Sequence, residues 1–133
     1  MLVDMAVADT SALLSLVGVL PLEPLDVDMI YAPDVALVEA IAVLRSFHDG
    51  RLTDIYGDLA AIGPMVTEWV SAHQLAGTLA ELAMAHPEQL ISDLAAVAAA
   101  KVTGLPLITG QPDLAGLDPD VAVILLRRRR LGD

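Results

Sequence analysis

The sequence predicts an α/β protein whose parallel sheet is covered by helices on both faces. Short apolar runs with the length of strands alternate with longer apolar stretches that have the length of helices. Gly and Pro residues separate most of these segments, and residues that favour helix starts precede several of the longer ones. This alternation is typical of strand–helix–strand crossovers, which place helices on both faces of parallel strands.

Five strands and five helices account for most of the chain. The predicted strands are short runs rich in apolar or β-branched residues, at 5–8, 29–32, 65–67, 105–109 and 121–126. The predicted helices start near capping residues or prolines and cover 12–20, 34–48, 53–61, 69–85 and 93–102. We expect Gly63 and Pro64 to break the chain before the third strand, and Ser92 to cap the last helix.

Length and composition indicate one domain with a core of small side chains. The chain has 133 residues, and we expect residues 1–133 to form a single domain. Hydrophobic residues make up 56% of it but aromatic residues only 3%, which favours closely packed helices. The absence of cysteine excludes disulfides, thiolate metal sites and cysteine nucleophiles, and fits a cytoplasmic protein. Without a long apolar run or a leader pattern, we expect a soluble protein and no membrane partner.

The charge distribution gives opposite indications about nucleic acid. A formal net charge of −11 argues against electrostatic adhesion to phosphates. However, four of the seven basic residues stand side by side, as Arg127, Arg128, Arg129 and Arg130. This tail either contacts RNA phosphates or an acidic partner, or it only increases solubility.

Three carboxylates stand where a parallel sheet would present them to a ligand. Asp9 follows the first predicted strand directly, and in open α/β sheets ligands bind beyond the carboxyl ends of the strands. Glu39 is the one charged residue between Asp34 and Arg45, in a helix that is apolar on nearly every side and should therefore be largely buried. Asp93 opens a helix with no other charge before Lys101.

Each of these acids has a structural interpretation beside the functional one. Asp9 and Asp93 are suitable helix caps, and Glu39 is either exposed, paired with Arg, or bound to a metal. If Asp9, Glu39 and Asp93 converge, their like charges require a hard cation such as Mg²⁺ or Mn²⁺ between them. The hypothesis therefore depends on convergence.

The sequence resembles the PIN-domain family, and especially the VapC-type toxins of bacterial toxin–antitoxin pairs. Four segments carry the likeness over most of the chain: VADTSAL at 7–13, APD with VEA at 32–40, SDLA at 92–95 and GLPLITGQPDL at 104–114. The resemblance implies a three-layer α/β/α sandwich with a central five-stranded parallel sheet. It also implies metal-assisted hydrolysis of RNA phosphodiesters.

The sequence departs from the family pattern at the fourth acidic position. Gln111 stands where the family has Asp, and a neutral amide cannot replace the charge of a carboxylate. The carbonyl oxygen of Gln111 can still coordinate a metal or orient its water, and Asp113 is a further potential metal ligand. Thr10 and Ser11 are auxiliary candidates that would orient a metal-bound water or a phosphate, unless their hydroxyls only cap a helix.

The residues and the resemblance together support two functional hypotheses. The first is a metal-dependent endoribonuclease, the toxin of a type II pair, in which Asp9, Glu39 and Asp93 hold Mg²⁺ or Mn²⁺ and are catalytic. Its partners would be an RNA substrate, a cognate antitoxin and a second copy of the chain. The second is a catalytically silent PIN-like module that binds a protein or RNA. An unrelated α/β protein, with its acids far apart, is the third alternative.

Overall fold

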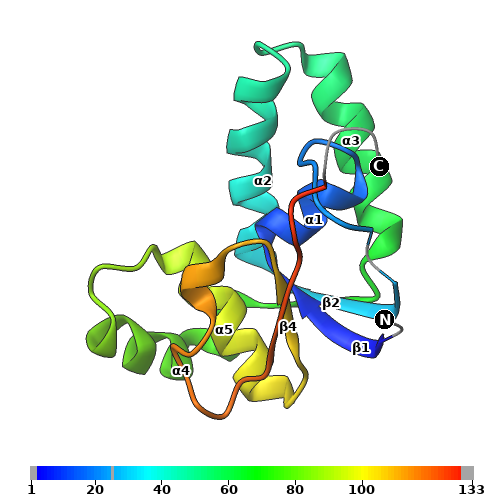
Figure 1. Ribbon diagram of the computed structural model, residues 1–133. Coiled ribbons are helices and arrows are strands. Elements are labelled where there is room, and N and C mark those ends of the chain that lie inside the picture. Colours follow the sequence, from blue (N-terminus) through cyan, green and yellow to red (C-terminus); the bar gives the residue numbers. More distant parts are fainter. Residues whose placement is uncertain (1–2, 25, 130–133) are drawn as a thin grey trace.

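The computed structural model describes residues 3–24 and 26–129 and contains one five-stranded sheet with helices on both sides (Figure 1). All strand pairs within the sheet are parallel, which confirms the predicted fold class. The strands are β1 (Val3–Ala8), β2 (Val27–Pro33), β3 (Glu68–Val70), β4 (Leu107–Thr109) and β5 (Val123–Leu125). The helices are α1 (Thr10–Leu16), α2 (Asp34–Phe47), α3 (Leu52–Met65), α4 (Ala72–Ala85), α5 (Ile91–Thr103) and the 3₁₀ turn η1 (Pro112–Leu114).

The strand order creates a switch point beside the first strand. The order across the sheet is β3-β2-β1-β4-β5. The chain therefore builds outward from β1 through β2 to β3, and then returns to the other side of β1 to add β4 and β5. The switch point lies between β1 and β4, and in open α/β sheets ligands usually bind at such a point, beyond the carboxyl ends of the strands.

Alternating side chains of the central strands divide the core into two layers. Val7 and Leu107 point to the face that α4 and α5 cover. Ala8 and Ile108 point to the opposite face, where α1 and α3 pack. This two-residue alternation is what a sheet buried on both sides requires.

Helix α5 lies at the centre of the first layer. Its residues from Asp93 to Ala100 are all buried, so the middle of this helix is enclosed on every side. Five of those eight positions are alanine, and their small side chains let neighbouring elements approach closely. Gly104 ends the helix in a left-handed conformation, which glycine adopts readily.

Helix α2 is much less buried than the sequence indicated. Of its 14 residues, Ala36, Ala40 and Leu44 are buried, and they form one stripe with a spacing of four. Val38 is 69% exposed and Ile41 is 42% exposed. The expectation of a largely buried helix was wrong because α2 and α3 form a hairpin that extends beyond the sheet (Figure 1), where one face finds a partner.

Several predicted boundaries were also wrong, among them the start of α4, which is Ala72 instead of residue 69 because β3 occupies Glu68–Val70. Helix α3 continues past Gly63 and Pro64 to Met65, because a proline in the last turn removes few hydrogen bonds and Ile62 is fully buried. The third strand is consequently displaced from 65–67 to Glu68–Val70. Helix α1 ends at Leu16 instead of residue 20, because Gly18 turns the chain with a φ of 75°.

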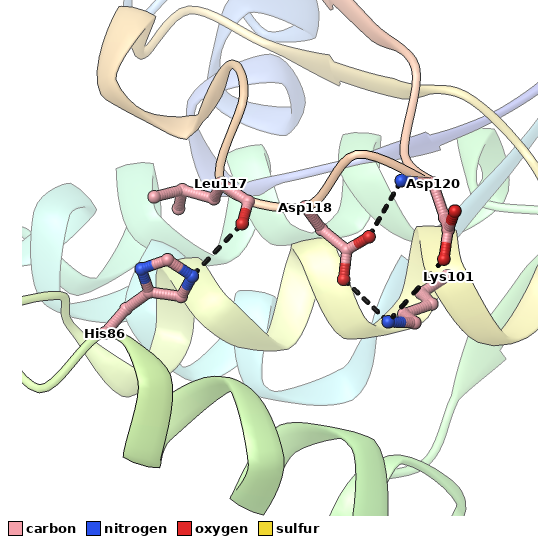
Figure 2. A network of polar contacts seen from close by, with 5 residues as sticks. All are labelled: His86, Lys101, Leu117, Asp118 and Asp120. Atoms are coloured by element: carbon pink, nitrogen blue, oxygen red, sulfur yellow. Dashed lines mark hydrogen bonds and ion pairs between the residues drawn. The ribbon is translucent and has the colours of Figure 1, made fainter.

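A polar network fastens the connection between β4 and β5 to the helical layer (Figure 2). The Lys101 ammonium on α5 donates a hydrogen bond of 2.7 Å to Asp118, and the backbone amide of Asp120 donates one of 2.9 Å to the other carboxylate oxygen. His86, just after α4, lies 3.1 Å from the carbonyl oxygen of Leu117 through its Nε2. The network holds one end of the segment that also carries η1.

Among the residues that the structure describes, no helix is both long and apolar enough to cross a membrane.

We predict that Asp118→Asn destabilises the protein at neutral pH but has little effect in acid. The hydrogen bond from Lys101 lowers the pKa of Asp118 below its ordinary value of 3.8, so its contribution is present above that pH. The contribution is lost as the pH falls through the lower folded-state pKa. Thermal unfolding at pH 7 and at successively lower pH measures the difference, and we expect the Tm of the variant to be lower than that of the wild type by about 2–6 °C at pH 7.

Asp120→Asn is the matched control, because its carboxylate is 76% exposed and 3.9 Å from Lys101. Equal losses in the two variants would contradict the assignment of the anchor to Asp118.

Candidate functional site

The candidate site lies at the carboxyl edge of the sheet, at the switch point between β1 and β4. Asp9 follows β1 directly, and Thr109 is the last residue of β4. Asp9 is 2% exposed and Thr109 is fully buried. The Asp9 backbone amide also donates a hydrogen bond of 3.3 Å to Ile108, so the two strand ends are joined there.

Asp9 is held by donors from two different segments. As the N-cap of α1, its Oδ1 accepts hydrogen bonds from the Ala12 amide at 2.9 Å and from the Ser11 hydroxyl at 2.6 Å. Its Oδ2 accepts a hydrogen bond from the Thr109 hydroxyl. The capping interpretation of Asp9 is therefore confirmed, and the cap is at the same time part of the site.

Burial affects the pKa of Asp9 more than these hydrogen bonds do. Desolvation raises the pKa of its carboxyl above the ordinary value of 3.8, and the negative charge of Asp93 raises it further. The donated hydrogen bonds act in the opposite direction without reversing the shift. A buried acid in this condition gains from any additional positive partner.

Asp93 is the second buried acid. It lies in the first turn of α5, is 6% exposed, and its Oδ1 accepts a hydrogen bond of 3.0 Å from the side-chain amide of Gln111. Burial raises the pKa of Asp93, and the charges of Glu39 and Asp113 add to this effect, while the Gln111 hydrogen bond opposes it. Asp93 is therefore close enough to Asp9, Glu39 and Asp113 for their charges to interact with it.

Glu39 reaches the site through Ser92. The Ser92 hydroxyl donates a hydrogen bond to Glu39 Oε2, which links α2 to the start of α5. Ser92 was predicted to cap α5, but that was wrong, because α5 begins at Ile91 with Leu90 as its N-cap. Glu39 itself is half-buried, and so is less enclosed than a largely buried α2 would have made it, for the reason given for α2.

Gln111 connects the two buried acids. The Thr109 hydroxyl accepts a hydrogen bond of 3.0 Å from the Gln111 backbone amide, which turns the chain after β4. Gln111 Nε2 then lies 3.0 Å from Asp93 Oδ1 and 3.5 Å from Asp9 Oδ2. The structure thus brings Asp9, Asp93 and Gln111 together and places Glu39 beside them.

The remaining predicted site residues divide into two groups. Ser11 belongs to the site, because it donates to Asp9 and accepts a hydrogen bond of 2.8 Å from the Gly110 amide. Thr10 instead donates to the Ala36 carbonyl oxygen at 3.4 Å and so joins α1 to α2. Asp113 is exposed in η1 and influences Asp93 by its charge.

Two residues of the site were not identified from the sequence. Thr109 ends a predicted strand, which is the same signal that singled out Asp9, but a neutral hydroxyl did not attract notice. Ser92 precedes Asp93, and the sequence pattern predicted that its hydroxyl caps the helix backbone. Partners of this kind orient the acids that they contact.

The site has the donor chemistry of a hard-cation site without a complete set of close acidic ligands. Among residues 3–24 and 26–129, no group of three or more His, Cys, Asp or Glu side chains is close enough to hold a metal ion. Over the same residues, none of the carboxylates of Asp9, Glu39 and Asp93 forms an ion pair with Lys, Arg or His. Two buried acids without a cationic partner, with further carboxylate and hydroxyl oxygens nearby, have the kinds of ligand atoms that Mg²⁺ and Mn²⁺ bind.

A groove lined mainly by apolar residues, and by none of the four acids, contacts the site through Ser11 and Gln111 and also contacts the basic tail. It has a volume of about 530 Å³, and its lining includes Ser11, Leu22, Gln111, Arg127 and Arg128. The tail is fixed there by backbone pairing, because Leu22 and Arg128 form an antiparallel bridge. Arg130 of the predicted tail lies outside the described residues.

No family model matches the chain, and no curated protein sequence matches it significantly. Among solved structures, the chain is similar to the crystal structure of PAE2754 from Pyrobaculum aerophilum. That likeness has a TM-score of 0.66 at 14% identity and covers 91% of this chain and 89% of the other. At such low identity the similarity shows the fold alone.

We predict that Asp93→Asn stabilises the metal-free protein at neutral pH by about 1 kcal/mol, because it removes a buried charge that has no cationic partner in the described part of the chain. Because the folded-state pKa of Asp93 is raised, the folded protein binds protons more readily than the unfolded chain above pH 3.8. Stability contributed by the protonated carboxyl is therefore lost as the pH rises through the folded-state pKa, and Asn removes that loss.

Urea unfolding in EDTA between pH 4 and pH 8 measures this effect. Asp4→Asn is the control, because Asp4 is exposed in β1 near the other end of that strand. A variant at residue 93 that is less stable than the wild type across this range would contradict the prediction.

Proposed function

We propose that this protein is a metal-dependent endoribonuclease of the PIN type that acts as the toxin of a type II toxin–antitoxin pair. The observation that carries the proposal is the meeting of Asp9 and Asp93 at the switch point of a parallel sheet, with Glu39 next to them. These acids come from three separate elements, and two of them are buried at an electrostatic cost. Such an arrangement is typical of a functional site.

In this proposal Asp9, Glu39 and Asp93 hold Mg²⁺ or Mn²⁺. When bound, the ion supplies positive charge that polarises the scissile phosphate and favours deprotonation of a water molecule. Ser11 and Thr109 fix the orientation of the Asp9 carboxylate, and Ser92 does the same for Glu39. No protein nucleophile is required.

The groove supports a polyanionic substrate despite the net charge of −11. Arg127 and Arg128 line it together with Ser11 and Gln111 of the site, and the side chains of both arginines are exposed and available to phosphates. A strand of RNA in the groove would contact these arginines through its phosphates. A local pair of cations thus offers phosphate binding that the overall charge does not.

Exposed apolar side chains on α2 support the two protein partners of this proposal, a cognate antitoxin and a second copy of the chain. Val38 and Ile41 lie beside the buried stripe of that helix, and Phe47 at its end is 54% exposed. A second copy of the chain or a cognate antitoxin would cover such side chains. We place this activity in the cytoplasm.

A specific observation favours the alternative of a catalytically silent PIN-like binding module. Gln111 replaces an acid of the family pattern, and its amide already satisfies both buried carboxylates. Such a module would bind RNA or a partner protein through the groove without cleaving RNA.

We expect the purified protein to cleave a single-stranded RNA with Mn²⁺ or Mg²⁺ and to be inactive in EDTA. Glu39→Gln and Asp9→Asn should each lower the cleavage rate at least about 100-fold, because each removes a charge from the metal site. Gel analysis of a labelled RNA measures the rates, and calorimetric titration with Mn²⁺ measures binding.

Glu81→Gln, an exposed change on α4, is the matched control and should retain full activity. Mn²⁺ binding without cleavage would favour the silent module, and activity that persists in Glu39→Gln and Asp9→Asn would contradict the proposed site.

A further inference from the structure

The side-chain amide of Gln111 lies within hydrogen-bonding distance of both buried acids. Its Nε2 is 3.0 Å from Asp93 Oδ1 and 3.5 Å from Asp9 Oδ2, so one amide group faces both carboxylates. An amide nitrogen carries two N–H donors, one for each acid. In the part of the chain that is described, no cationic side chain pairs with either acid.

Local contacts hold the backbone of Gln111 in place. Gln111 follows β4 and precedes η1, and its backbone amide is tied to the same Thr109 hydroxyl that contacts Asp9. Pro112 begins η1 and limits the backbone conformations of Gln111. The side chain therefore starts from a fixed point close to both acids.

The Gln111 amide and a cation would compete for the same carboxylate oxygens. A hydrogen bond to the Gln111 amide uses lone pairs of Asp9 and Asp93 that a shared cation would also need. A neutral amide compensates buried carboxylates less than a divalent ion does, which agrees with the raised pKa of both acids. The amide nitrogen and a bridging ion cannot occupy this position together.

We propose that the Gln111 side chain is a built-in substitute for the cation, which holds the two acids together in the metal-free protein and must leave before a metal binds. Gln111 is thus a positioning residue that sets the metal affinity of the site. This inference rests on the metal site of the proposed function. It contrasts with the expectation from the sequence, in which the carbonyl oxygen of Gln111 would help to bind the metal.

Gln111→Met tests the proposal, because methionine keeps the length of the side chain and removes its donors. Without metal, the variant should have a lower Tm than the wild type, since both buried acids lose a hydrogen bond. It should bind Mn²⁺ about tenfold more tightly in calorimetric titration, because no amide has to be displaced. The rise in Tm on adding Mn²⁺ should be correspondingly larger.

Gln89→Met is the matched control, since Gln89 lies in the connection between α4 and α5 and belongs to neither the site nor the groove. It should bind Mn²⁺ as the wild type does. If Gln111→Met does not fold, Gln111→Ala provides the same comparison. In the wild type, addition of Mg²⁺ should shift the side-chain amide signals of Gln111 in a ¹⁵N spectrum, which reports its displacement directly.

Unchanged or weaker Mn²⁺ binding by Gln111→Met would overturn the inference, as weaker binding would make the glutamine a metal ligand. Absence of Mn²⁺ binding in every variant would overturn it as well. The proposed nuclease is tested separately by RNA cleavage. Tighter binding in Gln111→Met with no cleavage by any form would leave the inference standing and remove the nuclease.

Discussion

The desolvation of Asp9 is the constraint on which the rest of the site depends. A carboxylate that is 2% exposed loses nearly all its contact with water, and this loss is large unless donors replace the water. The replacements come from the first turn of α1 and from the end of β4, two segments about a hundred residues apart in sequence. The position of Asp9 therefore requires that β1 and β4 be neighbours, and the parallel sheet provides this.

The central helix explains how a second acid approaches the first. The middle of helix α5 is enclosed on every side, and its alanines let the helix lie close to the neighbouring elements, so its first turn brings Asp93 to the carboxyl edge of the sheet. A helix with larger side chains would stand farther from the strands. The low aromatic content of the chain, 3%, is thus related to the compactness of the site.

Charge is distributed in this protein in a way that the net value conceals. Asp9 and Asp93 form a buried acidic pair, in which desolvation and neighbouring negative charges raise the pKa of both carboxyls. Arg127 and Arg128 line the neighbouring groove, where backbone pairing between residues 21–23 and the tail holds them. Ser11 and Gln111 belong to both the site and the groove lining, so in the proposed function a cation and a polyanion would bind at adjacent positions.

The sequence by itself determined the fold class and most of the elements, because hydrophobic periodicity, prolines and glycines act locally. It also located Asp9 and Asp93, since strand ends and helix starts are local features. Only the tertiary structure decided that Ser92 binds Glu39, that Thr109 binds Asp9, and that the amide of Gln111 faces both buried acids. These contacts join residues far apart in sequence, and a side chain's choice between its own backbone and a distant carboxylate depends on packing. Burial of α2 was decided in the same way, because the apolar pattern of a helix does not state how much of its surface finds a partner.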